Sequence, residues 1–191
     1  MQPDGDPVVP SCPIAMTNAD MGSLSATKAQ MCNVSGSMGT AHWYKLAAAM
    51  PGSMNYVQVD LWDKLGAFAG GVVHTGTFTI TGDDANPDKC GVCVRAMGAK
   101  GTADQKTYFA IGGTVNVTAV GTNGQPISAT LSNISFVEID PTSHKPVASG
   151  CSTSVAGAKL DGVVMQVGGG GGGTGGGGGS GAGGCLPGIA D

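Results

Sequence analysis

Charged side chains are scarce in this chain. They make up 12% of the 191 residues, roughly half of the share in ordinary soluble domains. Nine basic and thirteen acidic residues give a net charge of -4, and there is no run of lysines or arginines. Nucleic acids and anionic lipid surfaces are bound through such runs. We therefore expect neither as a partner.

Long apolar runs are missing too. No stretch approaches the roughly 20 apolar residues of a membrane-spanning helix. The first residues, MQPDGDPVVP, lack the basic and apolar regions of a signal peptide. We expect a mature secreted chain in which Met1 replaces a removed signal or lipoprotein leader, with a lipid anchor through that leader as one option. The alternative is a cytosolic protein as written.

Recognisable catalytic motifs are also missing. The sequence contains no H-E-x-x-H zinc motif and no G-x-S-x-G nucleophile elbow. His42, His74 and His144 stand far apart in the sequence, and His144 is expected in solvent. Glu138 is the only glutamate, so a carboxylate pair for glycoside hydrolysis would need an aspartate in the same cleft. We therefore predict that the protein is not an enzyme.

Cysteine and glycine, in contrast, are abundant. Six cysteines in a chain of low charge predict an oxidising, extracellular compartment and up to three disulfides whose pairing stays open. Residues 1–13 are predicted to form a proline-rich tether, 14–167 a disulfide-braced domain, and 168–191 a polyglycine segment ending in a cysteine-containing tail. A disulfide from that tail to the domain would close the polyglycine into a loop. The cysteines are Cys12, Cys32, Cys90, Cys93, Cys151 and Cys185.

Short segments with alternating apolar and polar residues, separated by glycine, proline and asparagine, predict an all-β fold. Asn123-Gly124 is a strong hairpin signal. About seven strands are typical of an antiparallel β-sandwich of jelly-roll or Ig-like type, with a barrel as the alternative. The predicted strands are 55–62, 72–81, 92–97, 108–120 (one or two strands), 127–139 (one or two strands) and 160–167.

One short accessory helix is predicted over residues 41–50. Trp43, Leu46, Ala47 and Met50 fall at helical spacing, and Pro51-Gly52 follows them as a stop. Glycines interrupt the weaker pattern before it, so residues 17–38 are expected to be irregular with at most one helical turn.

The densest chemistry lies between residues 77 and 97. Oxygen-bearing side chains alternate in the acidic loop, as in the first half of a calcium loop. Lys89 and Arg95 then occupy the positions that need glycine and glutamate, so the loop is not an EF-hand. Another type of Ca²⁺ site is one hypothesis, and a solvated acidic turn is the simpler one. The residues of the hypothetical site are Asp83, Asp84, Asn86 and Asp88.

Cys90 and Cys93 form a Cys-x-x-Cys motif directly after this loop. In a straight strand their Cα atoms would lie about 10 Å apart, beyond the roughly 4.4 to 6.8 Å that a disulfide spans. Either the chain turns at 89–91 and the two are bridged, or each pairs elsewhere. A structural disulfide is the favoured interpretation, with a redox dithiol or a zinc ligand pair as the alternatives.

Aromatic residues are few, at 5% of the chain. Trp62 and Tyr56 are candidate ligand-binding residues, because exposed aromatic rings stack on sugars. The simpler interpretation places such rings in the core.

The run VDLWDKLGAFAGGVVHTGTFTITGDDANPDKCGVCV, followed by YFAIGGTVNVTAVG, LSNISFVEID and GCSTSV, resembles uncharacterised secreted or lipoprotein-type proteins of myxobacterial character. The resemblance covers about residues 55–167. It implies a β-rich fold and an oxidising compartment, and it transfers no activity and no functional residue.

The leading hypothesis is a secreted, non-catalytic structural or adhesive protein of the cell surface or an extracellular assembly. Its expected partners are itself, other extracellular proteins or glycans. The alternatives are a glycan- or Ca²⁺-binding extracellular module and a secreted thiol oxidoreductase that uses Cys90 and Cys93. We expect no cofactor, unless the acidic loop binds Ca²⁺.

Overall fold

The computed structural model describes residues 12–14, 18–36, 39–51 and 54–167. Strands dominate this part of the chain, and its only helical elements are two single 3-10 turns, η1 (Gly66–Phe68) and η2 (Gly82–Ala85). None of the helical segments described is both long and apolar enough to cross a membrane. The predicted all-β class is confirmed. The predicted tether and polyglycine segment lie almost wholly outside the described residues.

Ten strands form one continuous sheet. Chain neighbours are mostly sheet neighbours, in the order β1-β9-β8-β7-β6-β4-β3-β2-β10, and the short β5 pairs with β7. The strands are β1 (Ala19–Ser25), β2 (Lys28–Gly36), β3 (Gly39–Ala49), β4 (Tyr56–Trp62), β5 (Gly76–Thr79), β6 (Val92–Gly98), β7 (Lys106–Val120), β8 (Pro126–Ile139), β9 (Ser152–Val163) and β10 (Met165–Gln166).

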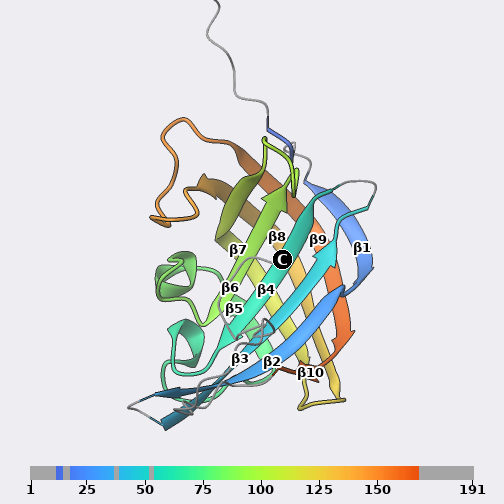
Figure 1. The fold of residues 1–191 in the computed structure, drawn as a ribbon, viewed down its shortest axis with the longest axis vertical. Helices are drawn as coiled ribbons and strands as arrows, with labels where there is room; N and C mark the ends of the chain where they lie inside the picture. The colour runs from blue at the N-terminus through green and yellow to red at the C-terminus, as the bar shows by residue number, and fades with distance from the viewer. Residues whose placement is uncertain (1–11, 15–17, 37–38, 52–53, 168–191) are drawn as a thin grey trace, which may run out of the picture.

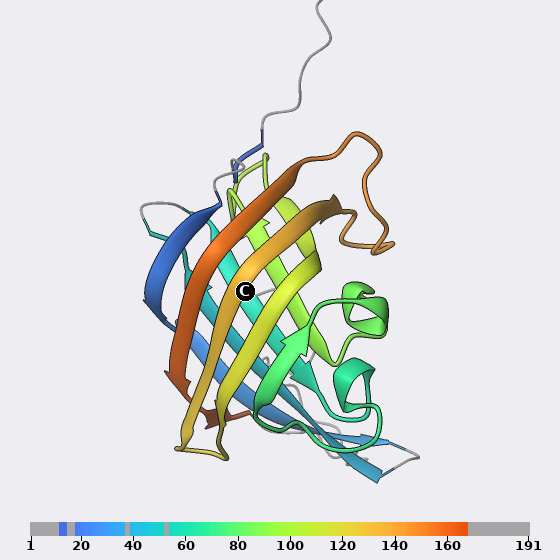
Figure 2. The same cartoon turned by 180° about the vertical axis from the view of Figure 1, so that it is seen from behind.

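The sheet is curled into a half-barrel (Figure 1). Strands β2, β3, β4 and β6 form the wall at the front, and β7, β8 and β9 form the opposite wall, seen from behind in Figure 2. Two short parallel pairs, β1 with β9 and β10 with β2, link the first and last parts of the described chain. All other pairs are antiparallel.

This arrangement corrects the predicted sandwich. A sandwich packs two sheets face to face, whereas here one sheet curls around its own core. The two longest strands allow this because each bends: the β7–β8 register shifts around Gly112, Gly113 has φ of 113°, and Asn133 has φ of 50°. Irregularities of this kind increase local twist and curvature. Strands β7 and β8 are therefore single long strands, which is one of the two alternatives predicted for 108–120 and for 127–139.

The predicted helix over 41–50 is wrong, because these residues lie in β3. Tyr44 and Leu46 point into the core, while Trp43 and Lys45 point to the opposite face, and all four are buried. With both faces covered, the strand shows no alternation of apolar and polar residues, and a helical spacing arises by coincidence. The irregular structure expected for residues 17–38 is also wrong, since β1 and β2 occupy most of them.

The core lies inside the half-barrel and contains side chains from both walls. Branched aliphatic side chains dominate it, and burial of each is worth about 1.5 to 3 kcal/mol. The largest fully buried apolar side chains facing it are Phe68, Phe136, Leu46, Leu61, Ile127, Leu131, Ile134, Leu160 and Val57.

A disulfide between Cys12 and Cys151 ties the start of the described chain to β9, with the two Cα atoms 5.7 Å apart. It spans a sequence separation of 139 residues, for which loop-closure entropy predicts about 4 to 5 kcal/mol of stabilisation. Glu138 supports this junction. Its carboxylate accepts the backbone N–H of Cys151 at 2.8 Å and lies 2.9 Å from the Lys106 amine.

Candidate functional site

The acidic turn is built around the buried carboxylate of Asp84. One of its oxygens, Oδ1, accepts the backbone N–H groups of Gly91 at 2.8 Å, Val92 at 2.9 Å and Ala67 at 3.3 Å. Because Asp84 is only 6% exposed, these donors replace the water that its carboxylate loses on folding. Asp84 thus joins η1, η2 and the start of β6 into one rigid corner.

Cys90 and Cys93 are bridged, and their Cα atoms lie 5.3 Å apart. The chain turns just before β6, where the backbone N–H groups of Lys89 and Cys90 both donate to the Asn86 carbonyl. A Cβ atom at Gly91 would overlap the Leu65 carbonyl oxygen, so only glycine fits. The structural disulfide and the turn that it requires are as expected.

A second link joins the acidic turn to the loop between β8 and β9. Nδ1 of His144 lies 2.6 Å from Oδ1 of Asp88, across a sequence separation of 56 residues. His144 has φ of 57°, and the turn before it is held by Asp140, whose Oδ1 accepts the N–H groups of Ser143 and Thr142. These hydrogen bonds, Ser143 first, lower the pKa of the Asp140 carboxyl. His144 is therefore paired rather than surrounded by solvent as expected.

Two hollows meet at the Asp88–His144 pair. The larger has a volume of about 320 Å³ and the smaller about 250 Å³. Both are lined by Pro87, Asp88 and His144, so the pair stands between them. We call the two together the bridged groove. The larger hollow is completed by Ala85, Asn86, Phe109, Ile111, Val137, Ile139, Ser143, Lys145 and Pro146, and the smaller by Trp62, Leu65, Cys90, Cys93 and Arg95.

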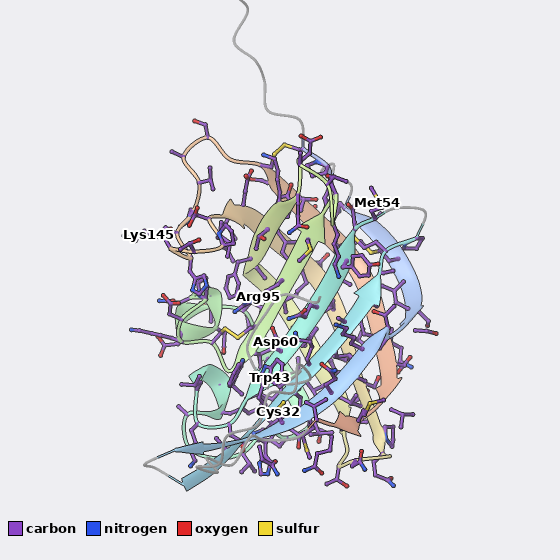
Figure 3. All side chains as sticks on the ribbon, in the orientation of Figure 1. Cys32, Trp43, Met54, Asp60, Arg95 and Lys145 are labelled. Atoms are coloured by element: carbon purple, nitrogen blue, oxygen red, sulfur yellow. A yellow bond between two sulfur atoms is a disulfide. The ribbon has the colours of Figure 1, made fainter. Side chains whose placement is uncertain are left out.

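The floor of the larger hollow is apolar and comes from β7 and β8. Phe109 and Ile139 are buried, whereas Ile111 is 49% exposed. The polar groups come from the loops above. Figure 3 shows Lys145 on the β8–β9 loop at the edge of the molecule and Arg95 on the face of the sheet. The bridged groove thus combines an apolar floor with a few polar groups on its rim.

The side chains predicted to bind calcium do not converge on one site. Asp84 accepts backbone N–H groups, Asn86 Oδ1 accepts the Asp88 N–H at 3.0 Å, and the Asp88 carboxylate faces His144. Among the described residues, no three acidic, histidine or cysteine side chains form a group that could hold a metal. The calcium hypothesis stays a prediction.

Trp62 and Tyr56 do not form one aromatic platform. They lie at opposite ends of β4, about 20 Å apart at the usual rise of a strand. Trp62 lines the smaller hollow and packs on Trp43 with 5.4 Å between ring centroids, while Tyr56 lies under the Lys100 amine at 4.9 Å. Only Trp62 belongs to the bridged groove.

Sequence reasoning missed a second histidine–aspartate pair. The Asp63 carboxylate accepts the His42 backbone N–H and lies 2.7 Å from the His42 ring, while its other oxygen accepts the Val73 N–H at 2.7 Å. Asp63 is buried, so its role is to fix the turn after β4. Neither histidine pair has a local signal in the sequence, because each joins residues that are distant along the chain.

Comparison with protein-family models, with curated proteins and with solved structures finds no match to this chain. The resemblance to secreted proteins of myxobacterial character therefore stays a prediction.

Proposed function

We propose that this protein is a secreted, non-catalytic binding module that takes a small carboxylate with an apolar body into the bridged groove. The observation that carries the proposal is the meeting of two hollows of about 320 and 250 Å³ at the Asp88–His144 pair. A purely structural or adhesive role does not require such a groove, so the geometry favours a binding module.

Size and rigidity support a small ligand. Ligand pockets commonly enclose roughly 300 to 1,000 Å³, lined by apolar side chains with a few fixed polar groups. The larger hollow, at about 320 Å³, falls at the lower end of this range. Its floor lies on two long paired strands, and its rim is fixed to the acidic turn by the Asp88–His144 pair. Such a site requires little ordering on binding.

Charge supports an anionic group on the ligand. Asp88 faces His144, and it is the only carboxylate among the described residues that line the groove. Lys145, on the same rim, takes part in none of the ion pairs found among the described residues. Arg95 lines the smaller hollow, but it is buried and its Nε lies 3.9 Å from Asp60 Oδ2, so Lys145 is the cation that faces the ligand. A ligand with its carboxylate beside Lys145 and its apolar chain over Ile111 would pair with the Lys145 amine and cover the apolar floor.

Secretion is part of the same proposal. Disulfides persist in oxidising compartments, and the Cys12–Cys151 and Cys90–Cys93 bonds are compatible with an extracellular protein. The thiol oxidoreductase alternative is less well supported. Cys90 and Cys93 are 2% and 1% exposed, whereas thiol–disulfide exchange needs a sulfur that an attacking thiolate can reach.

Calorimetric titration with octanoate tests the proposal, with 1-octanol as the matched ligand that lacks the charge. At about 0.5 kcal/mol per non-hydrogen atom, octanoate should bind with a Kd of about 0.2 mM. Lys145→Glu should abolish octanoate binding, while Lys159→Glu, on the exposed face of β9, should not. Octanoate that fails to bind at several millimolar, or binds equally to both variants, would contradict the proposal.

A further inference from the structure

The Asp88–His144 pair is held in place from both of its loops. On the β8–β9 loop, the backbone N–H of His144 donates to the Asp140 carbonyl at 2.9 Å, and the N–H of Asp140 donates to the Lys145 carbonyl at 2.9 Å. On the acidic turn, the N–H of Asp88 donates to Asn86 Oδ1 at 3.0 Å. Because the backbone is fixed on both sides, the imidazole is held between the two hollows.

The carboxylate of Asp88 determines which ring nitrogen of His144 carries the proton. An ionised carboxylate only accepts hydrogen bonds, so the 2.6 Å contact between Asp88 Oδ1 and His144 Nδ1 requires a proton on Nδ1. A neutral imidazole has a single N–H, and its other nitrogen is an acceptor. Nε2 of His144 therefore presents a lone pair.

This lone pair is unused by the described residues. Among them, His144 makes hydrogen bonds through Nδ1 with Asp88 and through its backbone N–H with Asp140. Nε2 takes part in neither bond, and the side chain of His144 is 36% exposed. The residue lines both hollows. A ligand that fills the bridged groove thus meets an unused hydrogen-bond acceptor where the hollows join.

The surroundings of this acceptor are mostly apolar. Pro87 lines both hollows, and Ile139 and Pro146 line the larger one. A polar group that a ligand covers without giving it a partner costs more affinity than the hydrogen bond would contribute. A purely apolar chain over His144 is therefore disfavoured, and a ligand with a donor at this point binds more tightly.

The acceptor and the cation of the groove are neighbours. Lys145 directly follows His144, so their Cα atoms lie about 3.8 Å apart, and both residues line the larger hollow. A ligand whose carboxylate pairs with Lys145 must place its donor close to that carboxylate. A hydroxyl group suits this position, because an ammonium group there would be repelled by the Lys145 amine.

We propose that the bridged groove selects hydroxy acids, in which a hydroxyl group on carbon 2 or 3 lies between the carboxylate and an apolar chain. The carboxylate pairs with Lys145, the hydroxyl donates to Nε2 of His144, and the chain covers the floor at Ile111. Asp88 does not touch the ligand and acts by holding the proton on Nδ1. This inference rests on the proposed function, since it names the class of carboxylate that the same groove takes.

Calorimetry with a series of acids of equal chain length tests the selection. Octanoate is the reference, 2-hydroxyoctanoate and 3-hydroxyoctanoate carry the donor, 2-oxooctanoate carries only an acceptor, and 2-aminooctanoate carries an ammonium group. The titrations are run at about pH 8.5, well above the ordinary titration range of imidazole. At least one hydroxy acid should bind about fivefold more tightly than octanoate, as one net hydrogen bond predicts. The oxo and amino acids should bind no more tightly than octanoate.

The outcomes separate a failure of this inference from a failure of the proposed function. If none of the acids binds, both are overturned. If octanoate binds and neither hydroxy acid binds more tightly, the proposed function stands and the inference is overturned. An oxo or amino acid that binds more tightly than both hydroxy acids would also overturn the inference.

Replacing the pair tests whether His144 recognises the hydroxyl group. The double variant His144→Phe with Asp88→Asn keeps a ring between the hollows and leaves no unpaired carboxylate beside it. The ratio of the hydroxy acid affinity to the octanoate affinity should fall from about fivefold to about one. His74→Phe, at an exposed histidine outside the groove, is the control and should leave this ratio unchanged. A ratio that stays high in the double variant would overturn the inference.

Nitrogen NMR of the unsubstituted protein tests the position of the proton without any ligand. Long-range ¹H–¹⁵N correlation at the same pH distinguishes the protonated from the bare nitrogen of an imidazole ring. His144 should carry its proton on Nδ1, and its Nε2 signal should shift saturably with the hydroxy acid and much less with octanoate. A proton on Nε2 in the free protein would overturn the inference, whatever the affinities of the acids.

Discussion

His144 and Asp88 lie 2.6 Å apart and join two loops that are separated by 56 residues in the sequence. Both side chains are partly exposed, at 36% and 66%, so their contribution to stability is small, about 0.5 kcal/mol. Their position matters more than their energy. The pair divides the bridged groove into its two hollows.

His144→Ala should therefore change the preference for ligand length. With the imidazole removed, the two hollows merge, and a longer apolar chain gains contacts at about 0.8 kcal/mol per buried methylene. We expect dodecanoate to gain about fivefold or more in affinity relative to octanoate, as measured by calorimetry. Asp104→Asn, an exposed carboxylate outside the groove, is the control and should leave the ratio unchanged. An unchanged ratio in His144→Ala would show that the pair does not divide the groove.

Asp84→Ala should destabilise the whole domain. It removes the acceptor of the Gly91, Val92 and Ala67 amides, and buried donors left without a partner cost about 3 kcal/mol in total. Urea unfolding followed by tryptophan fluorescence measures the difference. The exposed neighbour Asp83→Ala should stay within about 0.5 kcal/mol of the original chain. Equal effects of the two changes would refute the assigned role of Asp84.

Gly91→Ala tests how closely the backbone at residue 91, just before β6, approaches the Leu65 carbonyl group. The added methyl group would overlap the Leu65 carbonyl oxygen, and the backbone has to move at a cost of about 3 kcal/mol. Gly70→Ala is the matched control, since a Cβ there meets no atom within 4 Å. Thermal unfolding should show a clear drop in Tm for the first variant and almost none for the second. A stable Gly91→Ala protein would mean that the corner is looser than described.

Ser128→Ala should reveal a stabilisation that depends on pH. The Ser128 hydroxyl donates to Asp161 at 2.6 Å and is the main reason that the pKa of this carboxyl is lowered, with Lys159 second. A lowered folded-state pKa gives stability that is present above the unfolded value of about 3.9 and is lost as pH falls through the folded-state pKa. Asp161 is partly exposed, so we expect only about 0.5 kcal/mol at pH 7.

The measurement for Ser128→Ala is urea unfolding at a series of pH values. The difference from the original chain should shrink below about pH 4. Ser135→Ala, exposed on the same strand, should show no such pH dependence. A difference that stays constant down to pH 2 would contradict the assigned hydrogen bond.

Local patterns predicted those parts of the fold that local forces decide. The strands predicted at 55–62 and 92–97 correspond to β4 and β6, and the hairpin turn at Asn123-Gly124 connects β7 to β8. Glycine at position 91 was linked to the turn that the Cys90–Cys93 bond requires. These features depend on neighbours in the sequence.

Features that depend on the assembled sheet could not be predicted. Strand β3 is buried on both faces, so its sequence lacks the alternation that would distinguish it from a helix. The Asp88–His144 pair exists only because β8 returns beside β7 and carries its loop to the acidic turn. Burial of polar residues such as Asp60 and Lys45 likewise has no local signal.

Methyl NMR of the full chain during titration with octanoate tests the central claim most directly. The account predicts saturable shifts at Ile111, Val137 and Ile139, which line the larger hollow, and none at Val57 or Leu160 in the core. Absence of saturable shifts at the three groove residues, or shifts centred elsewhere, would contradict the proposed function.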